Sequence, residues 1–148
     1  MSGIRICIDT NVFLNVINRE EPFYSDSRTI LSVIDGRKIV GVVPTLVIAE
    51  ILTGYFANNK DSEAEEFVSS LSTNENLNIS PLGMEIALIS SRIKAKTGLR
   101  LPDAVVLGTA VQERADFLVT NDGHFPREFE HLKVLNPSAM AANLSDYS

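Results

Sequence analysis

The chain has 148 residues, 45% of them hydrophobic, which is enough for one domain with a proper core. A single cysteine excludes a disulfide framework, and with only two histidines it leaves too few soft ligands for a structural zinc site. The net charge of −6 argues against a protein that holds nucleic acid purely through a basic surface, although an enzyme whose acidic pocket binds cations stays open.

The first half of the chain alternates β-branched apolar runs with segments of helical spacing. It predicts, in chain order, strand 4–8, helix 12–17, helix 25–35, strand 39–43, helix 45–55 and helix 61–71. The first strand ends directly at Asp9, so we expect this carboxylate to leave the sheet at its carboxyl end. Glu50 lies early in an otherwise apolar helix, where burying a carboxylate is costly unless a charged group meets it.

The second half continues the alternation and adds a basic cluster. It predicts strand 77–79, helix 82–97, helix 101–111, strand 117–120 and strand 132–135. We therefore expect one domain over 1–136 and a polar C-terminal tail over 137–148. Arg92 and Lys96 are one helical turn apart and Arg100 lies just ahead of Asp103, so the three could hold backbone phosphates. Ordinary solvated charges are the alternative interpretation.

Strands separated by helices in this order predict a mostly parallel sheet covered on both faces. In such a sheet Asp9 and Asp122 both follow strand ends, Glu50 leaves the second strand, and Asp103 opens a helix that runs back. Four carboxylates then meet at the carboxyl edge, and their mutual repulsion predicts a bound cation. An all-oxygen ligand set favours Mg²⁺ or Mn²⁺. Each acid alone could equally have an ordinary role: Asp9 or Asp122 could cap a turn, Asp103 could lie at the positive end of its helix, and Glu50 could reach solvent.

Neutral polar side chains accompany the acids. Asn11 and Thr120 are suited to orienting the carboxylates or an attacking water, although ordinary turn and capping roles are equally open. One or two divalent ions at this edge could polarise a phosphodiester and lower the pKa of a water, as in two-metal nucleases. His124, two residues after Asp122, could contact a substrate, but we expect a surface histidine.

At these residues the chain resembles the PIN-domain nucleases. The resemblance rests on Ile-Asp-Thr-Asn-Val-Phe-Leu at 8–14, Glu50, Leu-Pro-Asp-Ala from 101, and Leu-Val-Thr-Asn-Asp-Gly-His-Phe at 118–125. It implies a three-layer α/β/α sandwich and Mg²⁺- or Mn²⁺-dependent cleavage of RNA. The metal-binding acids would then be Asp9, Glu50, Asp103 and Asp122, assisted by Thr120 or Asn11.

The compact length looks most like the VapC-type toxins of toxin–antitoxin pairs. That subfamily implies a homodimer and a cognate antitoxin that blocks the acidic pocket, although RNA-processing PIN nucleases share the same core. A cytoplasmic location is expected, because no signal peptide is visible and no apolar run reaches the roughly 20 residues that a membrane span needs.

Two other classes of protein stay open at this point. A phosphoryl-transfer or receiver-like protein also carries Asp after its first strand, but the residues after Asp9 lack the second strand-end acid of such phosphatases. A non-catalytic module could use the acids to hold a structural ion or a basic partner peptide. Metal titration alone would not separate such a module from a nuclease, whereas turnover by the purified protein would.

Overall fold

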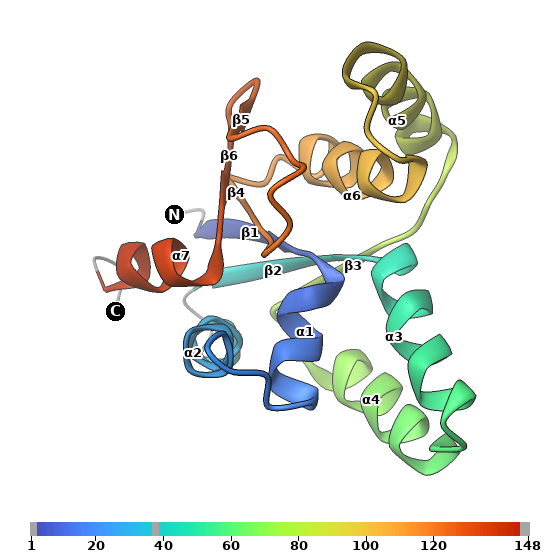
Figure 1. Ribbon diagram of the computed structural model, residues 1–148, viewed down its shortest axis with the longest axis vertical. Helices are drawn as coiled ribbons and strands as arrows, with labels where there is room; N and C mark the ends of the chain where they lie inside the picture. The colour runs from blue at the N-terminus through green and yellow to red at the C-terminus, as the bar shows by residue number, and fades with distance from the viewer. Residues whose placement is uncertain (1–2, 37–38, 146–148) are drawn as a thin grey trace.

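The computed structural model describes residues 3–36 and 39–145, and a mostly parallel sheet runs through its middle (Figure 1). The strands in the described residues are β1 (Ile4–Ile8), β2 (Ile39–Pro44), β3 (Leu77–Ser80), β4 (Phe117–Val119), β5 (Glu128–Phe129) and β6 (Leu132–Leu135). Their order across the sheet is β3-β2-β1-β4-β6-β5, and only β5 runs antiparallel to its neighbour. The predicted parallel sheet is confirmed, whereas the two-residue β5 was not predicted.

Helices cover both faces of this sheet. They are α1 (Thr10–Ile17), α2 (Tyr24–Asp35), α3 (Thr45–Ala57), α4 (Asp61–Thr73), α5 (Met84–Thr97), α6 (Leu101–Gln112) and α7 (Pro137–Leu144). Figure 1 shows α5 and α6 on one side of the sheet and the other helices on the opposite side. The predicted three-layer α/β/α sandwich is therefore confirmed. Among the described residues, no helix has the length and apolar character that crossing a membrane requires.

The core is centred on β1, which pairs in parallel with β2 on one side and β4 on the other. Ile6, Cys7 and Ile8 have no exposed surface, since helices cover both faces of a parallel sheet. Burial raises the pKa of the Cys7 thiol, so this residue packs as a small apolar side chain and is no reactive group. Asp9, which follows this buried strand, and the start of α1 therefore lie at the carboxyl edge of the sheet.

The segment after Asn136 differs from the polar tail that the sequence suggested. The Asn136 side chain accepts a hydrogen bond from the backbone N–H of Ala139 at 2.8 Å and thereby caps α7. Met140 and Leu144 are 0% and 1% exposed, and α7 packs against α2. Two apolar side chains one helical turn apart are a weak signal in sequence, but they are enough to dock a short helix. Residues 146–148 of the expected tail lie outside the described residues.

Candidate active site

Asp9 is the acid that the fold holds most firmly. It follows β1 and is the N-cap of α1, where its Oδ1 accepts the backbone N–H of Thr10 at 2.8 Å. Its Oδ2 accepts hydrogen bonds from Thr120 Oγ1 at 2.8 Å and from Asn11 Nδ2 at 3.2 Å. Asp9 is only 7% exposed, so three donors replace the water that this carboxylate has lost.

Thr120 joins the segments that follow β1 and β4. Its hydroxyl donates to Asp9 and accepts from Asn11 Nδ2 at 3.1 Å and from the backbone N–H of Asp122 at 3.0 Å. Asn11 also accepts the backbone N–H of Asn121 at 2.9 Å. The structure therefore brings Asn11 and Thr120 into direct contact with Asp9 and orients its carboxylate.

Burial raises the pKa of Asp9 from its usual 3.8 to about 6. The hydrogen bonds from Thr120 and Thr10 oppose this rise, and the negative charges of Asp103 and Glu50 add to it. Three of the four predicted acids are therefore near enough to interact electrostatically. A cation beside Asp9 would relieve both the burial cost and the repulsion.

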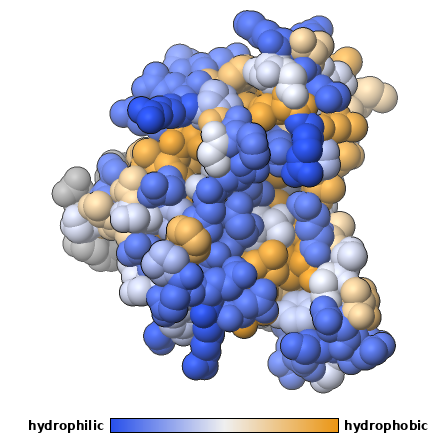
Figure 2. All heavy atoms as spheres, viewed as in Figure 1, coloured by the Kyte–Doolittle hydropathy of each residue, from blue (hydrophilic) through white to orange (hydrophobic). Residues whose placement is uncertain are grey.

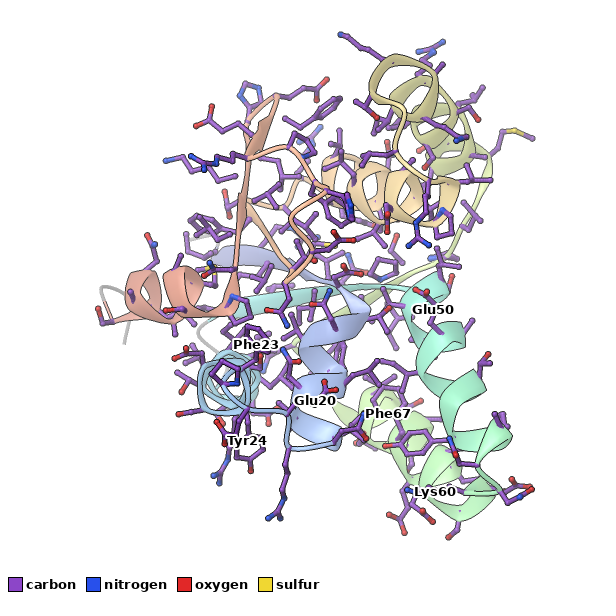
Figure 3. All side chains as sticks on the ribbon, in the orientation of Figure 1. Glu20, Phe23, Tyr24, Glu50, Lys60 and Phe67 are labelled. Carbon is purple, nitrogen blue, oxygen red and sulfur yellow. The ribbon has the colours of Figure 1, made fainter. Side chains whose placement is uncertain are left out.

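Asp103 and Glu50 reach this edge from opposite sides of the sheet. Asp103 lies in the first turn of α6, is 8% exposed, and its Oδ2 accepts Arg100 Nε at 3.3 Å. Glu50 is exposed in the second turn of α3 (Figure 3), and its Oε1 accepts a hydrogen bond from Thr10 Oγ1 at 2.8 Å. Glu50 reaches solvent, the alternative that the sequence left open, because α3 buries Val47 and Ile51 and turns Glu50 outward.

Asp122 follows β4 and turns to His124. Its Oδ1 accepts both the backbone N–H of His124, at 2.8 Å, and ring Nδ1, at 2.6 Å. Burial opposes ionisation of Asp122, but these contacts and the charge of Arg100 lower its pKa overall. This pairing has no strong signal in the sequence, although Asp-Gly-His is a turn-forming run in which the first side chain can bind the backbone two residues further on.

The three predicted basic residues are separated by the fold. Arg100 pairs with Asp103 and lines a surface pocket with Asp103 and His124. Arg92 and Lys96 are exposed on α5. Within the part of the chain that the structure describes, neither makes an ion pair with an acid. Arg100 is thus the basic residue that lies at the acidic edge.

The acids differ from the predicted arrangement in one respect. Among residues 3–36 and 39–145, no three Asp, Glu, His or Cys side chains lie close enough together to hold one metal ion. Like charges repel, and each carboxylate instead accepts a hydrogen bond from its own donor: Glu50 from Thr10, Asp103 from Arg100, and Asp122 from His124. The expected convergence on a shared ion is therefore incomplete.

The donor chemistry nevertheless fits a hard divalent cation. The carboxylates of Asp9 and Asp103 are buried, and the burial and repulsion that raise the pKa of Asp9 are effects that a cation opposes. The buried Oδ1 of Asn121, next in sequence to Thr120, has no hydrogen-bond partner among the described residues. Carboxylate and amide oxygens are the ligands that Mg²⁺ and Mn²⁺ prefer.

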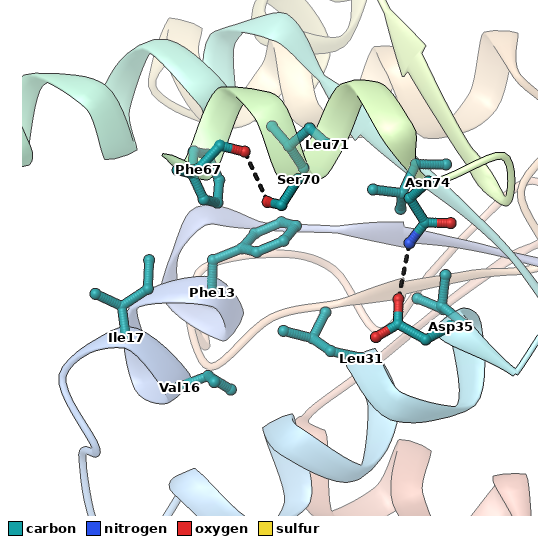
Figure 4. Close-up of a pocket in the computed structure, with 11 residues that line it drawn as sticks. Phe13, Val16, Ile17, Leu31, Asp35, Phe67, Ser70, Leu71 and Asn74 are labelled. Atoms are coloured by element: carbon teal, nitrogen blue, oxygen red, sulfur yellow. Dashed lines mark hydrogen bonds between the residues drawn. The ribbon is translucent and has the colours of Figure 1, made fainter. Parts of the chain in front are cut away.

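A separate apolar pocket lies between α1, α2 and α4 (Figure 4). Its lining residues include Phe13, Leu31 and Phe67. Asn74 and Asp35 also line it, and Asn74 Nδ2 donates a hydrogen bond to Asp35 Oδ1 at 2.8 Å. None of the four candidate acids lines this pocket. It is therefore distinct from the acidic edge.

Comparison with solved structures gives matches that share the fold. A toxin–antitoxin complex from Klebsiella pneumoniae matches with a TM-score of 0.63 and 20% identity, covering 79% of this chain and 86% of that one. The VapBC2 structure from Rickettsia felis, which is bound to a DNA fragment from the VapBC2 promoter, matches with a TM-score of 0.69 and 19% identity. That match covers 90% of this chain and 98% of that one. VapC20 from Mycobacterium tuberculosis, a sarcin-ricin loop cleaving toxin, matches with a TM-score of 0.65 and 11% identity. That match covers 80% of this chain and 90% of that one.

Two comparisons by sequence complete this picture. A search of curated proteins found no match. The family model of the PIN domain matches residues 6–128, which include Asp9, Glu50, Asp103 and Asp122. Because that match covers most of the sequence and the fold agrees, the chain belongs to the PIN domain family.

Proposed function

We propose that this protein is a Mg²⁺- or Mn²⁺-dependent endoribonuclease and the toxin of a cytoplasmic toxin–antitoxin pair. The observation that carries the proposal is the buried Asp9 carboxylate at the carboxyl edge of the sheet, in electrostatic contact with Asp103 and Glu50. Family membership supports nuclease chemistry, and the fold shared with a sarcin-ricin loop cleaving toxin supports RNA as the substrate.

Different residues of the chain would have different roles in this reaction. Asp9, Glu50, Asp103 and Asp122 would between them hold one or two divalent ions, which would polarise the phosphodiester and lower the pKa of a water. Thr120 and Asn11 hold the Asp9 carboxylate in one orientation, which keeps its donor atoms fixed. Arg92, Lys96 and Arg100 attract the RNA backbone, with Arg100 beside the acids.

The test is cleavage of single-stranded RNA by purified protein with Mg²⁺ or Mn²⁺. We expect Asp9→Asn and Asp103→Asn each to abolish cutting while circular dichroism and the melting temperature report a folded chain. Glu65→Gln, which removes one exposed acid from α4, is the matched control and should cut normally. Equal activity in both Asp variants would trace the cutting to a contaminating nuclease and end the assignment.

An antitoxin and a second copy of the chain are the proposed partners. The solved Klebsiella pneumoniae structure is a toxin–antitoxin complex with the same fold, which supports a protein inhibitor of the acidic edge. Co-expression with the product of a small neighbouring gene should yield a complex that no longer cuts RNA. A nuclease without such a partner would instead belong to RNA processing. Exposed Leu82, Met84 and Leu88 support a homodimer.

A further inference from the structure

A surface pocket beside the acids is lined by two planar side chains from different parts of the chain. It lies between the loop that joins α5 to α6 and the turn after β4, and Arg100, Asp103 and His124 are among its lining residues. Gly98 also lines it, and nothing lies within 4 Å of the place where a Cβ on this glycine would stand. The pocket therefore has room for part of a ligand next to Asp103.

Each planar side chain is held by one candidate acid. Arg100 Nε donates to Asp103 Oδ2 at 3.3 Å, and the Arg100 side chain is still 77% exposed. His124 Nδ1 contacts Asp122 Oδ1 at 2.6 Å, and the His124 side chain is 87% exposed. The acids thus restrict both side chains, while the two terminal guanidinium nitrogens and ring Nε2 have no hydrogen-bond partner in the described residues.

These two free ends have different chemistry. The guanidinium is a permanent cation whose terminal N–H groups suit phosphate oxygens. The Asp122 carboxylate engages ring Nδ1 of His124 and leaves Nε2 as the free ring nitrogen. A ribonucleotide offers a partner to each, because its phosphate oxygens accept from the guanidinium and its 2′-hydroxyl, both a donor and an acceptor, can hydrogen-bond Nε2. A deoxynucleotide lacks that hydroxyl.

We propose that this pocket is a ribonucleotide subsite in which Arg100 binds a backbone phosphate and the free Nε2 of His124 forms a hydrogen bond with the 2′-hydroxyl of the same nucleotide. The proposal rests on the proposed nuclease function and adds a reason for preferring RNA to DNA. His124 then determines specificity without touching the reacting bond, and Arg100 contributes affinity that does not depend on the sugar.

The test measures binding by fluorescence anisotropy in an Asp9→Asn background with Mg²⁺, so that the labelled strands stay intact. The probes are a single-stranded RNA, the DNA of the same sequence, and the 2′-O-methyl RNA, which cannot donate from the 2′ position. Arg100→Gln and His124→Phe are the test variants. Arg28→Gln and His131→Phe are controls, since both native residues are exposed and lie outside the pocket.

The two variants should give different signatures. We expect Arg100→Gln to weaken RNA and DNA alike, by about tenfold at low salt, and to reduce the slope of log affinity against log salt by about 0.7, the loss of one phosphate contact. We expect His124→Phe to weaken RNA binding about fivefold and to leave the binding of DNA and 2′-O-methyl RNA unchanged, because only one hydrogen bond, to the 2′-hydroxyl, is lost. The controls should match the background chain.

Each contrary result has a separate meaning. Equal effects of His124→Phe on all three probes, or none, would refute the ribose contact, and an unchanged salt slope in Arg100→Gln would refute the phosphate contact. RNA binding that responds as expected in a protein that never cuts RNA would leave the subsite standing and overturn the nuclease. No RNA binding by the background chain or the native chain would overturn both. Melting curves of every variant confirm that it is folded.

Discussion

At the scale of single residues, the cost of burying Asp9 makes stability depend on pH. The pKa of this carboxyl is 3.8 in a solvated chain and about 6 in the fold. Below pH 3.8 both states are protonated and nothing is lost. As the pH rises towards 6, the unfolded chain releases its proton first, so unfolding becomes more favourable. Above pH 6 the full cost applies, at about 3 kcal/mol.

We expect the chain with chelator present to lose stability between pH 4 and pH 7 relative to Asp9→Asn. The substituted chain has no carboxyl at position 9, so its unfolding free energy lacks this component. The readout is the difference between the two urea unfolding curves at several pH values, which cancels the other acids. If the unfolding free energies of the two chains changed with pH in the same way, a raised pKa at Asp9 would be contradicted.

Thr120 is the donor whose loss should be felt most strongly at Asp9. Thr120 is 3% exposed, and Thr120→Val keeps its shape while removing the hydroxyl that Asp9, Asn11 and the Asp122 backbone share. We expect a loss of about 1–3 kcal/mol near pH 7, measured by urea unfolding. Thr120→Ser retains the hydroxyl and should stay within about 1 kcal/mol of the native chain. A valine variant as stable as the serine variant would show that this hydroxyl is dispensable.

At the scale of elements, the sequence predicted what local pattern determines. The run over 4–8 became β1, Asp9 followed it, and Gly98 ended α5 with a φ of 75°. Parallel topology then placed the strand-end acids at one edge. The docking of α7 was missed, and the choice between burial and solvent at Glu50 stayed open, because each depends on packing between distant segments. The hydrogen-bond donor that pairs with each acid was not predicted, for the same reason.

The α7 helix offers a test of that point. Met140 has no exposed surface and packs with α7 against α2. Met140→Ala should therefore destabilise the chain by about 2–5 kcal/mol, as a buried large-to-small change does. Ser138→Ala, at an exposed position of the same helix, is the matched control in thermal unfolding. If Met140→Ala left the melting temperature unchanged, α7 would not contribute to stability and the segment would behave as the tail that the sequence predicted.

At the scale of the whole molecule, large apolar side chains are exposed on α5 and just ahead of it. Figure 2 shows hydrophobic surface on the side of the molecule where α5 lies. Leu82 precedes α5 and is 51% exposed, while Met84 and Leu88, one helical turn apart, are 75% and 53% exposed. Monomeric proteins rarely leave large apolar side chains clustered in this way. A second copy of the chain, presenting the same face, is the occupant that we propose.

Met84→Lys should convert a dimer of this kind to a monomer. In a two-fold interface both copies carry the change, so one substitution removes two apolar side chains and places two like charges at the contact. Sedimentation of the native chain should give twice the mass of one chain, and Met84→Lys half of that. Phe23→Lys, at an exposed aromatic residue ahead of α2, is the control and should stay dimeric. Persistence of the dimer in Met84→Lys would move the interface to another face, and a native monomer would contradict the dimer itself.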